Sequence, residues 1–204
     1  NHCSAKDVKK IIIFTNNDTA YQTAIDFFYK QEFEVQAIID VRKNSNGDLV
    51  KKAEVLGIKI FFNHAVIDTK GRKKINSVII SELDENLDKT IGRSKKLSCD
   101  LLCVSGGWTP TVHLFSQSKG KLLYRESDAT FIPDKSFQNE ISIGACNGTF
   151  ELNGILKETY TKISDLLTEF GKKIDVESRL NSEKIFYDKL RHLWIVPSNK
   201  HFGR

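Results

Sequence analysis

The 204-residue sequence contains no methionine, only three prolines, and no long run of apolar residues. A transmembrane helix needs about 20 consecutive apolar residues, so we expect no segment that spans a membrane. Residues 1–4 (NHCS) provide no apolar core for a secretory signal peptide. Because an initiator methionine is also missing, we expect the chain to be an excised or processed piece of a longer protein.

Cysteine is scarce, and its spacing excludes the common metal and redox motifs. Cys99 and Cys103 form the one close pair among four cysteines, and neither C-x-x-C nor zinc-finger spacing occurs. On a strand, residues four apart point to the same face, so we expect both thiols on one face as small buried hydrophobes. These features predict reduced cysteines, no metal site and a cytoplasmic setting.

The charge distribution is mildly basic and lacks a pattern. The net charge is +5, the lysines are scattered, and no nucleic-acid-binding motif accompanies them. With 40 % hydrophobic and 28 % charged residues, the composition is typical of a globular protein. We therefore predict a solvated surface and no nucleic-acid partner.

The apolar pattern predicts an α/β fold whose N-terminal part is a Rossmann-like parallel sheet with right-handed crossovers. Its expected elements are strands at residues 7–14, 35–39 and 58–62 and helices at 19–31 and 48–56. An antiparallel β-meander is expected to lie over this sheet. The remaining expected elements are apolar strands at 65–68, 75–83, 100–105 and 141–144, a solvated loop or frayed helix at 84–96, and a long helix at 150–170.

The loop after the first strand, residues 15–20 (TNNDTA), has the position of a dinucleotide-binding turn but no glycine. A carboxylate at Asp18, about 5 Å from a phosphate charge, costs roughly 3 kcal/mol at an effective dielectric of 20. The favourable interaction of an anion with a helix N-terminus contributes only about 0.3–2 kcal/mol. We therefore predict that Asp18 occupies the anion position and caps its own helix, with Asn17 as the alternative cap, and that this site is vestigial. Asp40 is either a ribose-binding acid or a polar residue at a strand end.

A second turn offers a better anion site. Residues 143–150 (IGACNGTF) contain Gly144 and Gly148, carry no charge, and precede a long predicted helix with free N–H groups. The pattern alone fits both a ligand-binding turn and a packing turn.

Three stretches together resemble the α subunit of heterotetrameric sarcosine oxidase and its relatives, which include the larger subunits of amino-acid and opine dehydrogenases. They are IIIFTNNDTAYQTAIDF, DLLCVSGGWTPTVHLFSQSKGKL and ISIGACNGTFELNGILKE, within residues 9–170, and residues 105–117 are the most specific part. The tail, with Leu193, Trp194 and Pro197, is similar to the connector that leads to a folate-binding, aminomethyltransferase-like domain.

The resemblance implies a two-dinucleotide-binding flavoprotein architecture. Residues 8–105 would be the inserted Rossmann-like domain, residues 106–171 the C-terminal half of the outer dinucleotide-binding domain, and residues 172–204 a linker to a following domain. The basic, irregular sequence of residues 172–204 also fits a strap over a neighbour. The upstream half of the outer domain, with its glycine-rich loop, would lie outside this chain. Trp108 and Pro110 would fix the crossing between the domains.

The resemblance also implies cofactors and partners. NAD would be held by Gly144, Ala145, Cys146, Asn147 and Gly148, through backbone amides and the Asn147 side chain, with Gly106 and Gly107 lining the same cleft. Flavin-binding members carry Asp at the position of Ala145, so this departure argues against FAD at the turn. FAD, FMN and tetrahydrofolate would belong to the parent complex with its β, γ and δ subunits.

In that family the complete enzyme oxidises sarcosine to glycine, produces hydrogen peroxide, and passes a one-carbon unit to tetrahydrofolate. Substrate oxidation belongs to the β subunit, so we expect no catalytic residue here and an inactive isolated chain. The alternatives are a stand-alone NAD(P)H-dependent reductase, with His64 or His113 as its acid or base, and a non-catalytic docking domain that uses the basic tail.

Overall fold

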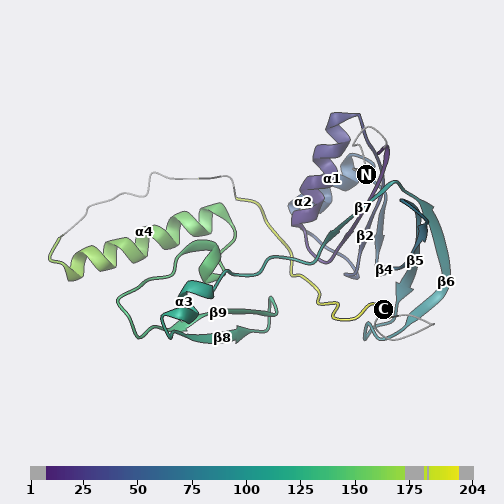
Figure 1. Ribbon diagram of the computed structural model, residues 1–204. Coiled ribbons are helices and arrows are strands. Elements are labelled where there is room, and N and C mark those ends of the chain that lie inside the picture. The colour runs from purple at the N-terminus through teal and green to yellow at the C-terminus, as the bar shows by residue number, and fades with distance from the viewer. Residues whose placement is uncertain (1–7, 173–181, 183, 198–204) are drawn as a thin grey trace. The chain divides into compact units, whose positions relative to one another are not determined.

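The computed structural model describes residues 8–172, 182 and 184–197. The chain divides into two compact units, unit 1 comprising residues 1–107 with 185–204, and unit 2 comprising residues 108–184 (Figure 1). Within the described ranges, none of the helices combines the length and apolar character that crossing a membrane requires.

Unit 1 is built on a parallel sheet with the strand order β3-β2-β1-β7. Its elements are β1 (Lys10–Thr15), α1 (Thr19–Lys30), β2 (Glu34–Asp40), α2 (Asp48–Val55), β3 (Ile60–Phe62) and β7 (Leu101–Ser105). The predicted Rossmann-like parallel sheet is confirmed, and β7 adds a fourth strand beside β1. Three of its strands, β1, β2 and β3, end at neighbouring points of one edge, where ligands bind in folds of this kind.

An antiparallel meander follows, with the order β4-β5-β6. Its strands are β4 (His64–Gly71), β5 (Ile75–Leu83) and β6 (Thr90–Ser98). In Figure 1 the helices α1 and α2 cover one face of the parallel sheet and the meander covers the other. The prediction of a loop or frayed helix at residues 84–96 is confirmed for residues 84–89, which form a turn. It is wrong for residues 90–96, because β6 gains its order from backbone pairing with β5 while its charged side chains stay exposed.

The core of unit 1 follows the two-residue period of a strand. Ile11 and Ile13 pack with α1 and α2, whereas Ile12, between them, packs with Val78 and Ile80 of the meander. Both faces of the sheet are therefore buried, which explains why its strands are continuous apolar runs.

The two neighbouring cysteines do not share a face, contrary to expectation. Cys99 precedes β7 and lies in the cluster on the meander side, whereas Cys103 lies within β7 and packs on the helix side. The same-face rule fails because Cys99 is outside the strand.

Unit 2 combines a β-hairpin with short helices and one long helix. Its elements are α3 (His113–Gln117), the hairpin β8 (Lys121–Arg125) and β9 (Thr130–Lys135), the 3-10 helix η2 (Gly144–Asn147) and α4 (Leu152–Glu169). The strand predicted at residues 141–144 is absent from the described ladders, although Ile143 keeps an extended backbone (φ −138°, ψ 145°). A strand needs a neighbouring strand to pair with, and this segment has none among the described residues.

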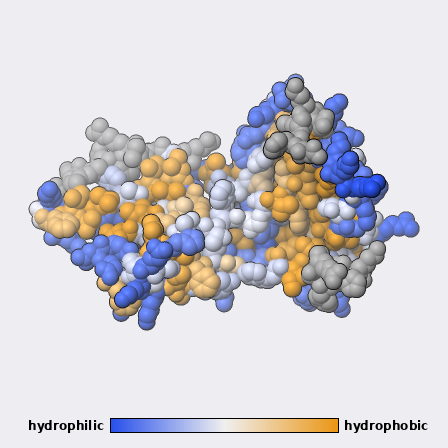
Figure 2. All heavy atoms as spheres, in the orientation of Figure 1, coloured by the Kyte–Doolittle hydropathy of each residue, from blue (hydrophilic) through white to orange (hydrophobic). Residues whose placement is uncertain are grey.

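The apolar surface of unit 2 is largely uncovered. Asn153 is the one buried residue of the 18-residue helix α4. Figure 2 shows apolar atoms gathered over unit 2 on the face drawn. Apolar residues exposed there include Leu114, Leu123, Phe131, Phe137, Leu152, Ile163 and Phe170. An amphipathic helix of this length normally packs its apolar side on another element, and the described residues of unit 2 provide no element that buries this side fully.

Candidate functional site

A buried cluster of charged groups fills the edge of the sheet in unit 1 where β1 and β2 end. Asp18, Asp40 and Arg42 are each at most 3 % exposed. The Arg42 guanidinium lies 2.7 Å from Asp18 Oδ1 and 2.6 Å from Asp40 Oδ2. Its Nε also donates to both carboxylate oxygens of Asp40, at 3.1 and 3.2 Å. Burial by itself lowers the pKa of Arg42, but its bonds and charge attraction to Asp40 and Asp18 outweigh burial and raise that pKa.

Of the two residues predicted to cap α1, Asp18 does not do so. Its backbone is helical (φ −76°, ψ −24°) and its side chain makes no cap hydrogen bond. The cap is Asn17, whose Oδ1 accepts the Thr19 N–H at 3.1 Å and the Thr19 hydroxyl at 2.6 Å. The Asp18 carboxylate is turned toward Arg42 and also accepts the Ser45 hydroxyl at 3.0 Å.

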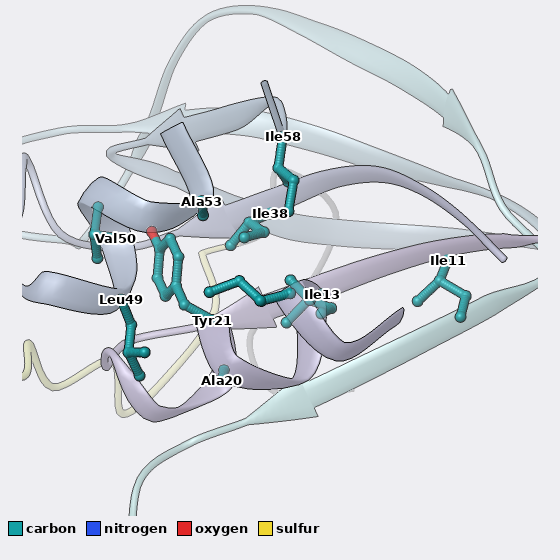
Figure 3. Close-up of a cluster of buried hydrophobic side chains, with 11 residues drawn as sticks. Ile11, Ile13, Ala20, Tyr21, Ile38, Leu49, Val50, Ala53 and Ile58 are labelled. Atoms are coloured by element: carbon teal, nitrogen blue, oxygen red, sulfur yellow. The ribbon is translucent and has the colours of Figure 1, made fainter. Parts of the chain in front are cut away.

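Asp40 is bound from the helix side by Tyr21. The Tyr21 ring is fully buried and lies among Leu49, Val50 and Ile38 in the core cluster shown in Figure 3. Its hydroxyl donates to Asp40 Oδ2 at 2.7 Å. Burial, followed by the charge of Asp40 and this bond, raises the pKa of the Tyr21 hydroxyl. Of the two roles open for Asp40, this geometry supports that of a polar residue at a strand end, because its oxygens are taken by protein donors.

The electrostatics of this edge oppose a phosphate. Two carboxylates and one guanidinium give the buried cluster a formal charge of −1. An added anion would meet this net negative charge in a region of low dielectric, where repulsion is strongest. The structure thus gives a physical reason for reading the loop as a vestigial nucleotide site.

Sequence reasoning did not identify Arg42 or Ser45 as part of this site. The available signal was that Arg42 follows an acid at a strand end by two residues. What decided its orientation is the proximity of Asp18, which comes from a different strand end.

The second candidate site, the turn at Gly144–Asn147, is a 3-10 helix closed by Gly148 with φ 79°. Several of its polar groups already have partners. The Gly144 N–H donates to Glu158 Oε2 at 3.0 Å, and the Asn147 amide donates to Glu158 Oε1. Burial raises the pKa of Glu158, but these two bonds, a hydrogen bond with the Thr149 side chain and the charge of Lys162 together outweigh burial and lower that pKa. The Glu158 carboxylate, on helix α4, therefore accepts hydrogen bonds from the N–H donors that an anionic ligand would use.

The helix that follows the turn begins later than predicted. It starts at Leu152, two residues beyond the expected position, and Glu151 provides no side-chain cap. The Gly148 and Thr149 N–H groups donate to the Ala145 and Gly144 carbonyl oxygens. The assignment of NAD contacts to Gly144, Ala145, Cys146, Asn147 and Gly148 stays a prediction.

A hollow of about 500 Å³ lies in unit 2 beside this turn. Asn147 and Thr149 line it, together with Arg125 from the hairpin and Lys162 and Asp165 from α4. Arg125 also donates to the Gly148 carbonyl oxygen at 2.8 Å, and so ties the hairpin to the turn.

The other residues of the predicted cleft are divided between the units. Gly106 and Gly107 end unit 1 after β7, whereas the Gly144 turn belongs to unit 2. Trp108 opens unit 2, where its ring lies 6.3 Å from that of Phe150. That Gly106 and Gly107 line one cleft with the Gly144 turn stays a prediction.

The histidine candidates have different surroundings. His64 Nδ1 lies 2.6 Å from the Phe62 carbonyl oxygen, and its ring lies 5.5 Å from that of Phe61. His113, the first residue of α3, is exposed. Among the described residues, His, Cys, Asp and Glu form no group of three or more that is arranged to hold a metal ion.

Comparison with curated proteins confirms the predicted resemblance. The chain is 33 % identical over 191 residues to sarcosine oxidase subunit alpha of Corynebacterium sp. (strain P-1), covering 93 % of this chain and 19 % of the relative. It is 28 % identical over 164 residues to the subunit of the same name from Rhizobium meliloti (strain 1021), covering 78 % of this chain and 15 % of that relative. The chain thus spans less than a fifth of the length of these relatives. No protein-family model matches it.

Comparison with solved structures confirms the fold class. Thioredoxin reductase of T. acidophilum superposes with a TM-score of 0.60 at 17 % identity, over 80 % of this chain and 53 % of that one. Mycobacterium tuberculosis FprA in complex with NADPH superposes with a TM-score of 0.53 at 12 % identity, over 81 % and 53 % of the two chains. The α/β fold of this chain is therefore shared with these two proteins.

Proposed function

We propose that this chain is the central part of a sarcosine oxidase α-like subunit, in which it forms the scaffold and contributes one half of an NAD site. The observation that carries this proposal is sequence similarity to sarcosine oxidase α subunits across 93 % of the chain. The proposed boundaries are residues 8–105 for the inserted domain, 106–171 for the half-domain and 172–204 for the linker.

The incompleteness of unit 2 supports this proposal. Helix α4 fully buries none of its apolar residues, and the extended segment around Ile143 has no pairing strand among the described residues. Both features fit a half-domain whose sheet is supplied by polypeptide upstream. In the completed domain, NAD would contact the Gly144–Gly148 turn through backbone amides and the Asn147 side chain.

The parent enzyme would oxidise sarcosine to glycine and pass the one-carbon unit to tetrahydrofolate. FAD and FMN would act in the parent complex with its β, γ and δ subunits. This chain would supply no catalytic acid, base or nucleophile and would be inactive in isolation.

Titration calorimetry with NAD tests the half-site. The chain alone is expected to bind NAD weakly or not at all, and binding is expected to appear when the upstream glycine-rich half of a relative is supplied. Asn147→Ala should weaken the restored binding, whereas Asn139→Ala, a change at an exposed residue of the same unit, should not. Tight binding and turnover by the chain alone would instead favour the NAD(P)H-dependent reductase.

The parent activity is tested separately in the assembled complex. Hydrogen peroxide release should depend on sarcosine, and a one-carbon adduct of tetrahydrofolate should accumulate when folate is present. Turnover of dimethylglycine but not sarcosine would reassign the amine substrate, and absence of both activities would contradict the proposal.

A further inference from the structure

The ligand-binding edge of the sheet in unit 1 is covered by a segment from the other end of the chain. Residues 185–197, called the strap below, belong to unit 1. The Phe186 N–H donates to Asp48 Oδ2 at 2.8 Å, and the Asp48 N–H donates to the Phe186 carbonyl oxygen at 3.0 Å. This reciprocal pair fixes the strap at the start of helix α2.

The strap continues onto the buried charged cluster. The Asp188 N–H donates to Asp18 Oδ2 at 2.5 Å, the carboxylate oxygen that does not bind Arg42. The side chain of Asp188 binds the same edge, because its Oδ2 accepts the Asn46 N–H at 2.9 Å. Both oxygens of the Asp18 carboxylate therefore have protein partners, and one of them is a peptide N–H of the strap.

Arg191 joins the ends of all three leading strands. Its N–H donates to the carbonyl oxygen of Asn16, the residue after β1, at 3.2 Å. Its guanidinium donates to the carbonyl oxygen of Val41, after β2, and to Oδ1 of Asn63, after β3, both at 3.1 Å. A further bond of 2.7 Å reaches the Glu85 carbonyl oxygen. In open α/β sheets, nucleotides bind at this row of strand ends.

Apolar contacts complete the attachment. Leu193 and Val196 pack on the small cluster formed by Val41, Ala65 and Leu83. The strap is thus held by backbone pairing, by a carboxylate and a guanidinium, and by two apolar anchors, as peptide ligands are held by receptor grooves.

We infer that the former nucleotide edge of unit 1 is a peptide-binding site whose occupant is the strap, residues 185–197 of the same chain. Asp18 accepts a peptide N–H at the loop where a working site would hold a phosphate, and Arg191 spans the strand ends where a nucleotide would lie. The site anchors the polypeptide that leaves unit 1 and does not gate a working nucleotide pocket. This inference rests on unit 1 alone and is independent of NAD binding by unit 2.

Hydrogen exchange of the full chain tests the inference. Arg191→Ala should raise exchange across residues 185–197 by about tenfold or more, because three side-chain bonds are lost. Residues 10–15 and 152–169 should be unchanged. Lys189→Ala is the matched control, since the hydrogen bonds of Lys189 at this edge are made by its backbone, and it should leave exchange in the strap unaltered.

If Arg191→Ala also raises hydrogen exchange at residues 10–15, unit 1 has unfolded in that variant. Asp188→Ala is then the variant that tests the inference. That variant removes the acceptor of Asn46 but keeps the N–H bound to Asp18, and should raise exchange at residues 46–48 and in the strap. Unchanged strap exchange in the interpretable variants would overturn the inference.

Adding NAD or NADP at millimolar concentration distinguishes an anchor from a lid. For an anchor, strap exchange stays the same in the presence of either nucleotide, in the parent chain and in Arg191→Ala. Release of the strap by nucleotide, with new protection at residues 15–19, would show a live nucleotide site beneath a lid and would overturn the inference. Protection confined to residues 144–149 would report on unit 2 instead.

Discussion

A Cβ atom placed on Gly47 would lie 2.0 Å from Oδ2 of Asp18. Gly47 precedes the first residue of α2, and its backbone angles (φ −60°, ψ 149°) are open to any residue. The glycine is therefore needed for close approach and not for its conformational freedom. Helix α2 begins directly against the carboxylate that organises the charged cluster.

Substituting Gly47 should test how closely this contact is packed. We expect Gly47→Ala to reduce the free energy of unfolding by about 1–3 kcal/mol, the cost of overpacking a filled site. Urea denaturation measures the change. Gly106→Ala is the control, because open space surrounds the position of its Cβ, and its effect should stay within about 0.5 kcal/mol. Equal effects of the two substitutions would contradict the packing argument.

Removing Arg42, the cation of the buried cluster, should reduce the free energy of unfolding more than Gly47→Ala does. Arg42→Met leaves Asp18 and Asp40 buried without their shared partner, and breaking a buried pair in this way costs about 3–5 kcal/mol. Thermal unfolding measures the loss. Adding Asp18→Asn to Arg42→Met should recover part of the stability, because one uncompensated charge is removed. No recovery would indicate that packing of the arginine side chain, and not its charge, stabilises this edge.

The Tyr21 hydroxyl should stabilise the fold through its hydrogen bond to Asp40. Tyr21→Phe keeps the ring in the core and removes the donor 2.7 Å from Asp40 Oδ2, which should cost about 1–2 kcal/mol. Tyr29→Phe is the matched control on the same helix, since Tyr29 is 60 % exposed. A loss for Tyr21→Phe no larger than that for Tyr29→Phe would place the stabilising interactions of Asp40 entirely with Arg42.

The attachment of the strap should weaken in acid. The Asn46 and Lys189 N–H groups hold the pKa of Asp188 below its usual value near 3.9. A depressed folded-state pKa contributes stability that is present above the unfolded value and is lost as pH falls through the folded one. We expect protection of the Asn46 amide, measured by NMR-detected exchange and corrected for intrinsic rates, to fall below about pH 4. Asp188→Asn should remove this pH dependence, and its persistence would assign the effect to another carboxylate.

Glu158 should stabilise the glycine turn of unit 2. Glu158→Gln replaces one carboxylate oxygen by an NH₂ group, which cannot accept hydrogen bonds from both Gly144 and Asn147. We expect faster exchange at residues 144–148, by about tenfold for one lost bond. Glu169→Gln is the control, because Glu169 is an exposed residue at the end of α4. Unchanged exchange in Glu158→Gln would show that the turn is held by its backbone alone.

Much of unit 1 could be predicted from the sequence because its signals are local. A continuous apolar run such as residues 11–13 indicates a strand buried on both faces, and the structure places it there. β6 could not be predicted in this way. Its side chains carry charge and face solvent, so only pairing with β5, a non-local interaction, makes it a strand.

The sequence by itself determined that the first loop is unfavourable for phosphate, since it places a carboxylate, Asp18, in the turn and no glycine. Only the tertiary structure decided what that carboxylate does. Its partners Arg42 and Asp188 come from another strand end and from a position 170 residues away. Groups so far apart in sequence meet only after the sheet and the strap are in place, because their contacts depend on a tertiary arrangement that local sequence does not encode.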